Sequence, residues 1–156
     1  MDRLFEQGTW IWLAGIGVLA LLLVLDLSWA RRPRFKRCSV MTANEREFYQ
    51  RILQACPDCE IWPQVPLLAL VRPEGREGSR AFWAAFRQIS NTRTDWVIAQ
   101  NTEVLAIIEL DDRSHDAKRD ARRDEILKGC GYRVLRFQSK NRPEPQQIHD
   151  AIFAGR

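Results

Sequence analysis

Hydrophobic and polar positions follow helix or strand periods along most of the chain after residue 41. Over residues 42–56 the apolar side chains recur at intervals of three and four, so we predict a helix that ends at Pro57. Thr42 and Glu45 have the spacing of a capping box at its start. The apolar run over residues 60–71 is interrupted by prolines, which predicts a strand that is irregular or lies at a sheet edge.

Residues 80–90 have the apolar density of a short buried helix. Two apolar runs with the composition of strands follow it. Residues 95–100 and 103–111 then predict a β-hairpin with its loop at residues 101–103. In that register the numbers of paired residues sum to 204, which places Val97 opposite Ile107.

The C-terminal third predicts helix, strand and helix. Residues 118–131 form a charged helix with Ile126 and Leu127 facing inward. Residues 132–138 form a short strand, and residues 143–153 a helix that begins at either of its first two prolines. The complete order predicts an α/β domain with a mixed sheet flanked by helices.

An apolar segment precedes this domain. Residues 10–25 carry no charge, and continuing to residue 30 adds only Asp26 and a serine. Because 21 helical residues span roughly 31 Å, we predict one membrane-spanning helix at residues 10–30 of an N-terminal segment 1–30. A cleaved secretory signal and a buried soluble helix are the alternatives.

The flanks of this segment predict its orientation. A signal peptide would normally begin with a basic region and end in small residues, and both features are poor here. A basic linker over residues 31–40 follows, so the positive-inside rule predicts a single-pass protein of the inner (cytoplasmic) membrane. The domain at residues 41–156 then faces the cytoplasm.

Charge and cysteines add little to this picture. The net charge is +4, but residues 1–37 supply +3 of it, so the domain neither requires nor excludes a polyanionic partner. A single CxxC pair, Cys56 and Cys59, lacks a second pair or nearby histidines, although Cys38 and Cys130 could supply further ligands. We therefore favour free thiols in a reducing compartment over a zinc site at Cys56 and Cys59.

Acidic residues gather at one end of the predicted hairpin. The register opposes Asp95 to Glu109, and strand alternation turns Asp111 to the same face. Opposed carboxylates need compensation, and oxygen ligands of this kind suit Mg²⁺ or Mn²⁺. The alternative is that Asp95 and Glu109 simply end their strands in water.

Four segments of the chain resemble a known family. TANEREFYQRIL, TDWVI, IIELDDRSHD and RRDEILKGCGYRVLRF together look like the DUF2726 domain of unknown function, over about residues 41 to 153. That family is a branch of the restriction-endonuclease-like PD-(D/E)xK superfamily related to very-short-patch-repair endonucleases. The resemblance implies a three-layer domain with a mixed central sheet.

The same resemblance implies roles for individual acidic residues. Asp95 and Glu109 would be metal ligands, and Glu45 on the first helix would hold metal-bound water. Asp111 stands where the signature lysine of the superfamily would be, as in the very-short-patch-repair-like branch, and is included with the metal ligands. Glu45 has a plainer alternative role, which is to close the capping box.

Three basic side chains complete the site that the resemblance implies. His115 would activate water or stabilise the transition state, and Arg119 and Arg136 would contact phosphate. In the plainer alternatives, His115 caps the next helix from the surface and Arg136 pairs with a neighbouring carboxylate.

The leading functional hypothesis is a membrane-anchored, metal-dependent nuclease that hydrolyses phosphodiesters in nucleic acid. The second is a catalytically inactive nuclease fold kept as a membrane-tethered binding or interaction module. A zinc-dependent redox or structural protein built on the CxxC pair is a weaker third. The expected partners are nucleic acid and, through the N-terminal helix, the membrane; protein partners are left open.

Overall fold

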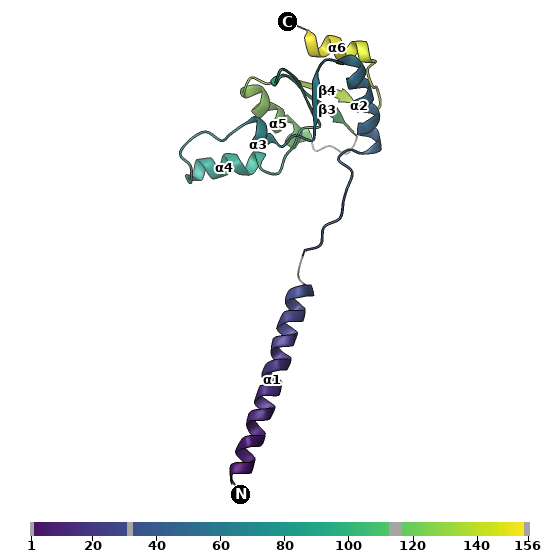
Figure 1. The fold of residues 1–156 in the computed structure, drawn as a ribbon. Coiled ribbons are helices and arrows are strands. Elements are labelled where there is room, and N and C mark those ends of the chain that lie inside the picture. Colours follow the sequence, from purple (N-terminus) through teal and green to yellow (C-terminus); the bar gives the residue numbers. More distant parts are fainter. Residues whose placement is uncertain (1, 31–32, 113–116, 155–156) are drawn as a thin grey trace. The chain divides into compact units, whose positions relative to one another are not determined.

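The computed structural model describes residues 2–30, 33–112 and 117–154, and divides into two compact units (Figure 1). The first unit runs to Cys38 and the second begins at Ser39. Each unit is described by itself.

The N-terminal unit is built on one helix, α1 (Asp2–Ala30). Its apolar side chains over residues 12–25 are exposed. The predicted membrane span at residues 10–30 is corrected: a helix forms there, but no helix in the described part of the chain is long and apolar enough to cross a membrane.

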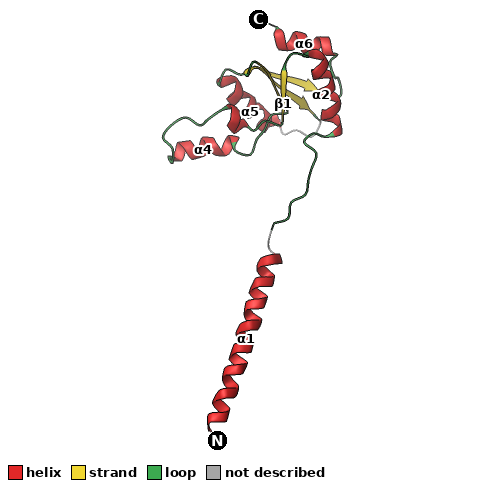
Figure 2. Cartoon of the chain, viewed as in Figure 1, coloured by secondary structure: helices red, strands yellow, loops and turns green. Residues whose placement is uncertain are grey.

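The second unit contains a four-stranded sheet in the order β1-β2-β3-β4 (Figure 2). The first two pairings are antiparallel and the third is parallel, which confirms the predicted mixed sheet of an α/β domain. The predicted edge position of the first strand is also confirmed, and Pro63 ends it. The strands are β1 (Glu60–Pro63), β2 (Trp96–Gln100), β3 (Glu103–Asp111) and β4 (Val134–Gln138).

One face of the sheet is covered by α2 (Ala43–Ala55) and α6 (Pro145–Phe153). The predicted capping box starts α2, and α6 begins at the second of its two prolines. Fully buried Phe48 lies with its ring centroid 5.6 Å from those of Trp96 and Phe137. Burial of such a side chain contributes roughly 2 to 3 kcal/mol, so this aromatic group anchors α2 to the sheet.

The other face carries a second apolar cluster, in which Leu67 and Leu127 pack with Val97 and Ile107. Leu67 belongs to the short helix α3 (Leu67–Leu70), which the sequence pattern did not predict, and Leu127 to α5 (Ala117–Gly129). Helices therefore lie on both faces of the sheet.

The helix predicted over residues 80–90 forms as α4 (Arg80–Ile89), but it is not the buried helix expected. Only Ile89 is buried, and Trp83 is 46% exposed. Its aromatic side chains Phe82, Trp83 and Phe86 contact one another instead of the core, which explains why apolar density alone misled.

The hairpin register is as predicted at its far end and shifted near its turn. Val97 pairs with Ile107, and Trp96 with Ile108, as the sum of 204 requires. A bulge between Ile98 and Ala99 then shifts the register, and a two-residue turn replaces the expected three-residue loop. Positive φ angles at both turn residues, Asn101 and Thr102, are typical of that turn.

Candidate metal and phosphate site

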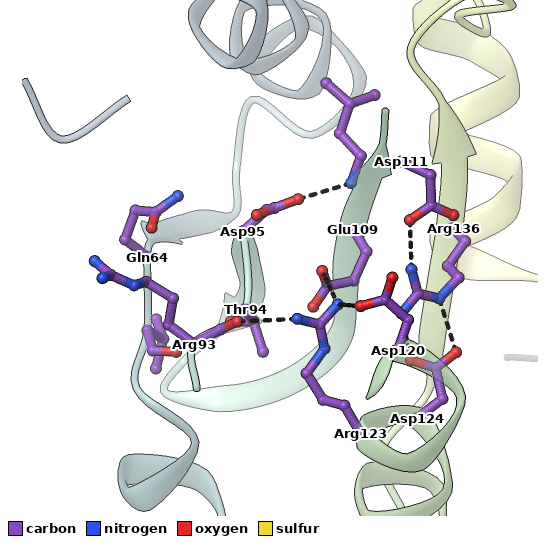
Figure 3. Close-up of polar contacts among 12 residues, drawn as sticks. Gln64, Arg93, Thr94, Asp95, Glu109, Asp111, Asp120, Arg123, Asp124 and Arg136 are labelled. Atoms are coloured by element: carbon purple, nitrogen blue, oxygen red, sulfur yellow. Dashed lines mark hydrogen bonds and ion pairs between the residues drawn. The ribbon is translucent and has the colours of Figure 1, made fainter. Parts of the chain in front are cut away.

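The candidate site lies on the α5 side of the sheet, where the far end of the hairpin meets β4 (Figure 3). Glu109 of β3 pairs in register with Arg136 of β4, so both side chains stand on the same face. The helix α5 supplies Arg123, which contacts Glu109, and Asp124, which contacts Arg136.

Glu109 is the buried centre of the site. The residue is only 1% exposed, and its Oε2 accepts a hydrogen bond of 2.7 Å from Nη2 of Arg123. Its other oxygen, Oε1, is buried and has no hydrogen-bond partner among the described residues. A buried carboxylate oxygen without a partner is costly to keep, and such an atom is a common sign of a functional position.

Burial raises the pKa of Glu109 to about 8. Arg123 opposes this rise, whereas the negative charge of Asp95 adds to it. At neutral pH the carboxyl group therefore holds a proton much of the time, and a cation at the site would displace that proton.

Asp95 immediately precedes β2, whose first residue, Trp96, pairs with Ile108 of β3. Its Oδ2 accepts a hydrogen bond of 2.8 Å from the backbone nitrogen of Leu110, which holds the carboxylate against β3 (Figure 3). Asp95 thus lies against Leu110, the residue that follows Glu109, and its negative charge contributes to the raised pKa of Glu109.

Asp111 lies in a different set of contacts. It forms an ion pair with Nη1 of Arg136, whose Nε and Nη2 each donate to Asp124 over 2.8 Å. Within the described part of the chain, no three His, Cys, Asp or Glu side chains are grouped so as to hold a metal ion. The expected three-carboxylate cluster is therefore reduced to two neighbouring acids, while Asp111 faces an arginine.

Arg136 follows the plainer of its two sequence interpretations. The hydrogen bonds that Arg136 donates to Asp124 raise its pKa further above its ordinary value, so the guanidinium stays charged. Two carboxylates already occupy its donors, which leaves it little capacity to hold a phosphate as the resemblance implied.

Glu45 closes the capping box of α2 and also reaches toward the sheet. Its carboxylate accepts from the backbone nitrogen of Thr42, while its Oε1 accepts from Nε2 of Gln64 over 3.2 Å. Gln64, in turn, donates its backbone N–H to the carbonyl of Asp95 over 2.8 Å. The structure thus links Glu45 to Asp95 through Gln64, so the two sequence interpretations of Glu45 are compatible.

Two predicted site residues cannot be placed. His115 lies outside the described residues. Arg119 belongs to the first turn of α5, but its side chain is not among those described.

None of the four cysteines forms a disulfide. Burial raises the pKa of Cys56 to about 12, with a smaller contribution from Cys59. Zinc binds the thiolate, so a thiol that is hard to deprotonate is a poor start for a zinc site.

The most important contact that sequence reasoning missed is Arg123. A signal was available, because Asp120, Arg123 and Asp124 lie seven, four and three positions before Leu127 and hence on its side of the helix. Leu127 was correctly predicted to face inward and is fully buried. Charged residues on that inward face could have been predicted to meet the carboxylates of the sheet.

Comparison with known proteins gives one match. No curated protein and no solved structure matches the chain. The family model described as protein of unknown function (DUF2726) matches residues 37–155, about three quarters of the sequence. The chain belongs to the DUF2726 family.

Proposed function

We propose that the domain is a metal-dependent nuclease of the PD-(D/E)xK type, related to the very-short-patch-repair endonucleases, that hydrolyses phosphodiesters in nucleic acid. The single observation that carries the proposal is the unpartnered, buried Oε1 of Glu109 beside Asp95. A chain without a function for that oxygen would gain stability by replacing the carboxylate with an apolar or amide side chain.

The residues present fit a small divalent cation with few protein ligands. Mg²⁺ is commonly held by one or two carboxylates, with water and substrate phosphate completing an octahedron. Asp95 and the free oxygen of Glu109 supply such a pair. Bound Mg²⁺ or Mn²⁺ would lower the pKa of a coordinated water and neutralise charge on the scissile phosphate.

The surrounding residues hold this pair in position. The backbone nitrogen of Leu110 fixes Asp95, and Arg123 fixes Glu109 while leaving Oε1 available. Glu45 is linked through Gln64 to the backbone carbonyl of Asp95, and its proposed role is to hold water beside the acidic pair. His115 remains the proposed group for proton transfer.

A second candidate is a catalytically inactive nuclease fold that binds nucleic acid or a protein. It is favoured by Arg123, which already neutralises Glu109, and by Asp111, which replaces the signature lysine and pairs with Arg136. In this case the arginine substitutes for the cation, and the acidic pair is structural.

Cleavage assays separate the two candidates. Labelled single-stranded and double-stranded DNA and RNA are incubated with the chain and Mg²⁺ or Mn²⁺, with EDTA as the metal-free reference. The proposal expects cleavage that is lost in Asp95→Asn and Glu109→Gln but kept in Glu103→Gln, an exposed acid at the turn end of the same strand. Absence of cleavage on all substrates by a folded wild-type chain would favour the inactive module.

A further inference from the structure

A cavity of about 430 Å³ lies between the end of α4 and α5. Three of the residues that line it are arginines, and three more are uncharged polar residues that can donate hydrogen bonds. No carboxylate lines this cavity. These polar residues are Arg87, Arg122, Arg123, Gln88, Asn91 and Thr92.

Two of the three arginines of this cavity carry uncompensated charge, whereas Arg123 is paired with Glu109 and Asp120. Within the described part of the chain, neither Arg87 nor Arg122 forms an ion pair, although both side chains are exposed. Nε of Arg122 donates to Oε1 of Gln88 over 3.1 Å, which connects α5 to α4 and orients the guanidinium. An oriented arginine with free donors presents the planar fork that phosphate groups accept.

Arg123 joins the cavity to the acidic pair. Its side chain lines the cavity, and its Nη2 contacts Glu109 over 2.7 Å. A strand held in the cavity would therefore run directly beside the candidate cleavage site.

One of the two arginines that the resemblance assigned to phosphate, Arg136, does not compete for this role. Arg136 is held by Asp111 and Asp124, whereas no carboxylate among the described residues forms an ion pair with Arg87 or Arg122. The volume also fits, since pockets for small ligands begin at about 300 Å³ and a single phosphate would not fill this one.

We propose that this cavity binds the phosphodiester backbone of a nucleic acid strand, on the side of α5 that also contacts Glu109, through Arg87 and Arg122. The inference rests on the proposed function for its substrate class. It adds the element that a nearly neutral domain otherwise lacks, a local cationic surface for the backbone.

Binding without catalysis tests the inference. Fluorescein-labelled 20-nucleotide DNA, as a single strand and as a duplex, and RNA of the same sequence are titrated with the 156-residue chain in EDTA, with anisotropy as the readout. The double variant Arg87→Gln/Arg122→Gln is compared with Arg76→Gln/Arg80→Gln, which removes the same charge from exposed positions that do not line the cavity. Circular dichroism and thermal melting confirm that all three proteins are folded.

We expect the cavity variant to bind at least about tenfold more weakly than wild type, while the control changes less than about twofold. The slope of log K against log salt should fall by about 1.5 to 2 in the cavity variant, because two phosphate contacts are removed. Equal binding by the two double variants would overturn the inference.

Competition separates nucleic acid from other anions. Adenosine monophosphate and a poly-glutamate peptide are added to the complex. Saturable binding of the mononucleotide or of the acidic peptide, without oligonucleotide binding, would also overturn the inference.

The outcomes for the two proposals can be told apart. Oligonucleotide binding that depends on Arg87 and Arg122, without cleavage under any metal condition, would support the cavity and contradict the nuclease activity. Metal-dependent cleavage, together with oligonucleotide binding that does not change when both arginines are replaced, would support the nuclease activity and contradict the binding role of the cavity.

Discussion

Arg123 donates a hydrogen bond of 2.7 Å to one oxygen of the buried Glu109 carboxylate, while the second oxygen has no partner among the described residues. The pairing is asymmetric: one oxygen is fixed and the other is available. This geometry is what distinguishes a site prepared for a ligand from an ordinary buried ion pair, in which both oxygens would be satisfied.

Glu109→Gln should change how stability depends on pH. The pKa of Glu109 is raised from 4.5 to about 8 in the folded chain, so the folded state binds this proton more tightly than the unfolded state. The stability that this group contributes is therefore complete below about pH 4.5 and is lost as the pH rises toward 8. Relative to the variant, wild type should lose on the order of 3 kcal/mol of unfolding free energy between pH 5 and pH 8.

Urea unfolding of both proteins at pH 5, 6.5, 8 and 9 checks this expectation. Other titrating groups are common to the two chains, so the difference between the curves isolates Glu109. Parallel curves across the series would mean that the pKa of Glu109 is not raised and that the carboxylate is not strained at neutral pH.

Arg136→Gln should destabilise the domain. The substitution leaves Asp111 and Asp124 without their shared partner, close to the buried Glu109. Loss of such a partly buried network costs about 2 kcal/mol of unfolding free energy. Arg72→Gln, at an exposed position, should change it by less than about 0.5 kcal/mol.

Chemical denaturation of these two variants at pH 7 gives the comparison. If Arg136→Gln were as stable as the control and instead weakened oligonucleotide binding, Arg136 would be a phosphate contact, as the family resemblance implies.

The cysteines should differ strongly in their reaction with iodoacetamide. Cys38 and Cys130 are exposed, whereas Cys56 is buried and its pKa is raised to about 12, so little thiolate forms at pH 8. Peptide mass spectrometry over time should show the two exposed cysteines modified first and Cys56 modified only after unfolding. If Cys56 were alkylated as fast as Cys130, the interpretation of Cys56 and Cys59 as a reactive or zinc-binding pair would be favoured again.

Much of the fold could be predicted because its signals are local. The capping box at Thr42, the prolines of the edge strand and the apolar runs of the hairpin each determine an element within a few residues. The misassigned elements depended on distant packing. Nothing local distinguishes an aromatic helix that meets the core from α4, whose aromatics meet each other.

The candidate site was predictable in its acidic half only. The predicted register holds as far as the Trp96–Ile108 pair, and Asp95 then bonds the backbone nitrogen of Leu110, next to Glu109. The residues that contact those acids come from α5 and β4. The connection between the parallel strands β3 and β4, which includes α5, brings them to the site. The sequence indicated that Arg123 and Arg136 existed, but the choice between phosphate and carboxylate partners required the tertiary structure.

The most direct test of the central claim is calorimetric titration of Mg²⁺ and Mn²⁺ into wild type, Asp95→Asn, Glu109→Gln and the control Glu103→Gln, at pH 7 and pH 8.5. A cation at Glu109 must displace the proton held there, so wild-type affinity should rise with pH, by up to about tenfold per unit below the pKa. The account predicts that the control retains this binding and that both site variants lose it. Absence of binding in wild type at both pH values, or binding that survives both site substitutions, would contradict it.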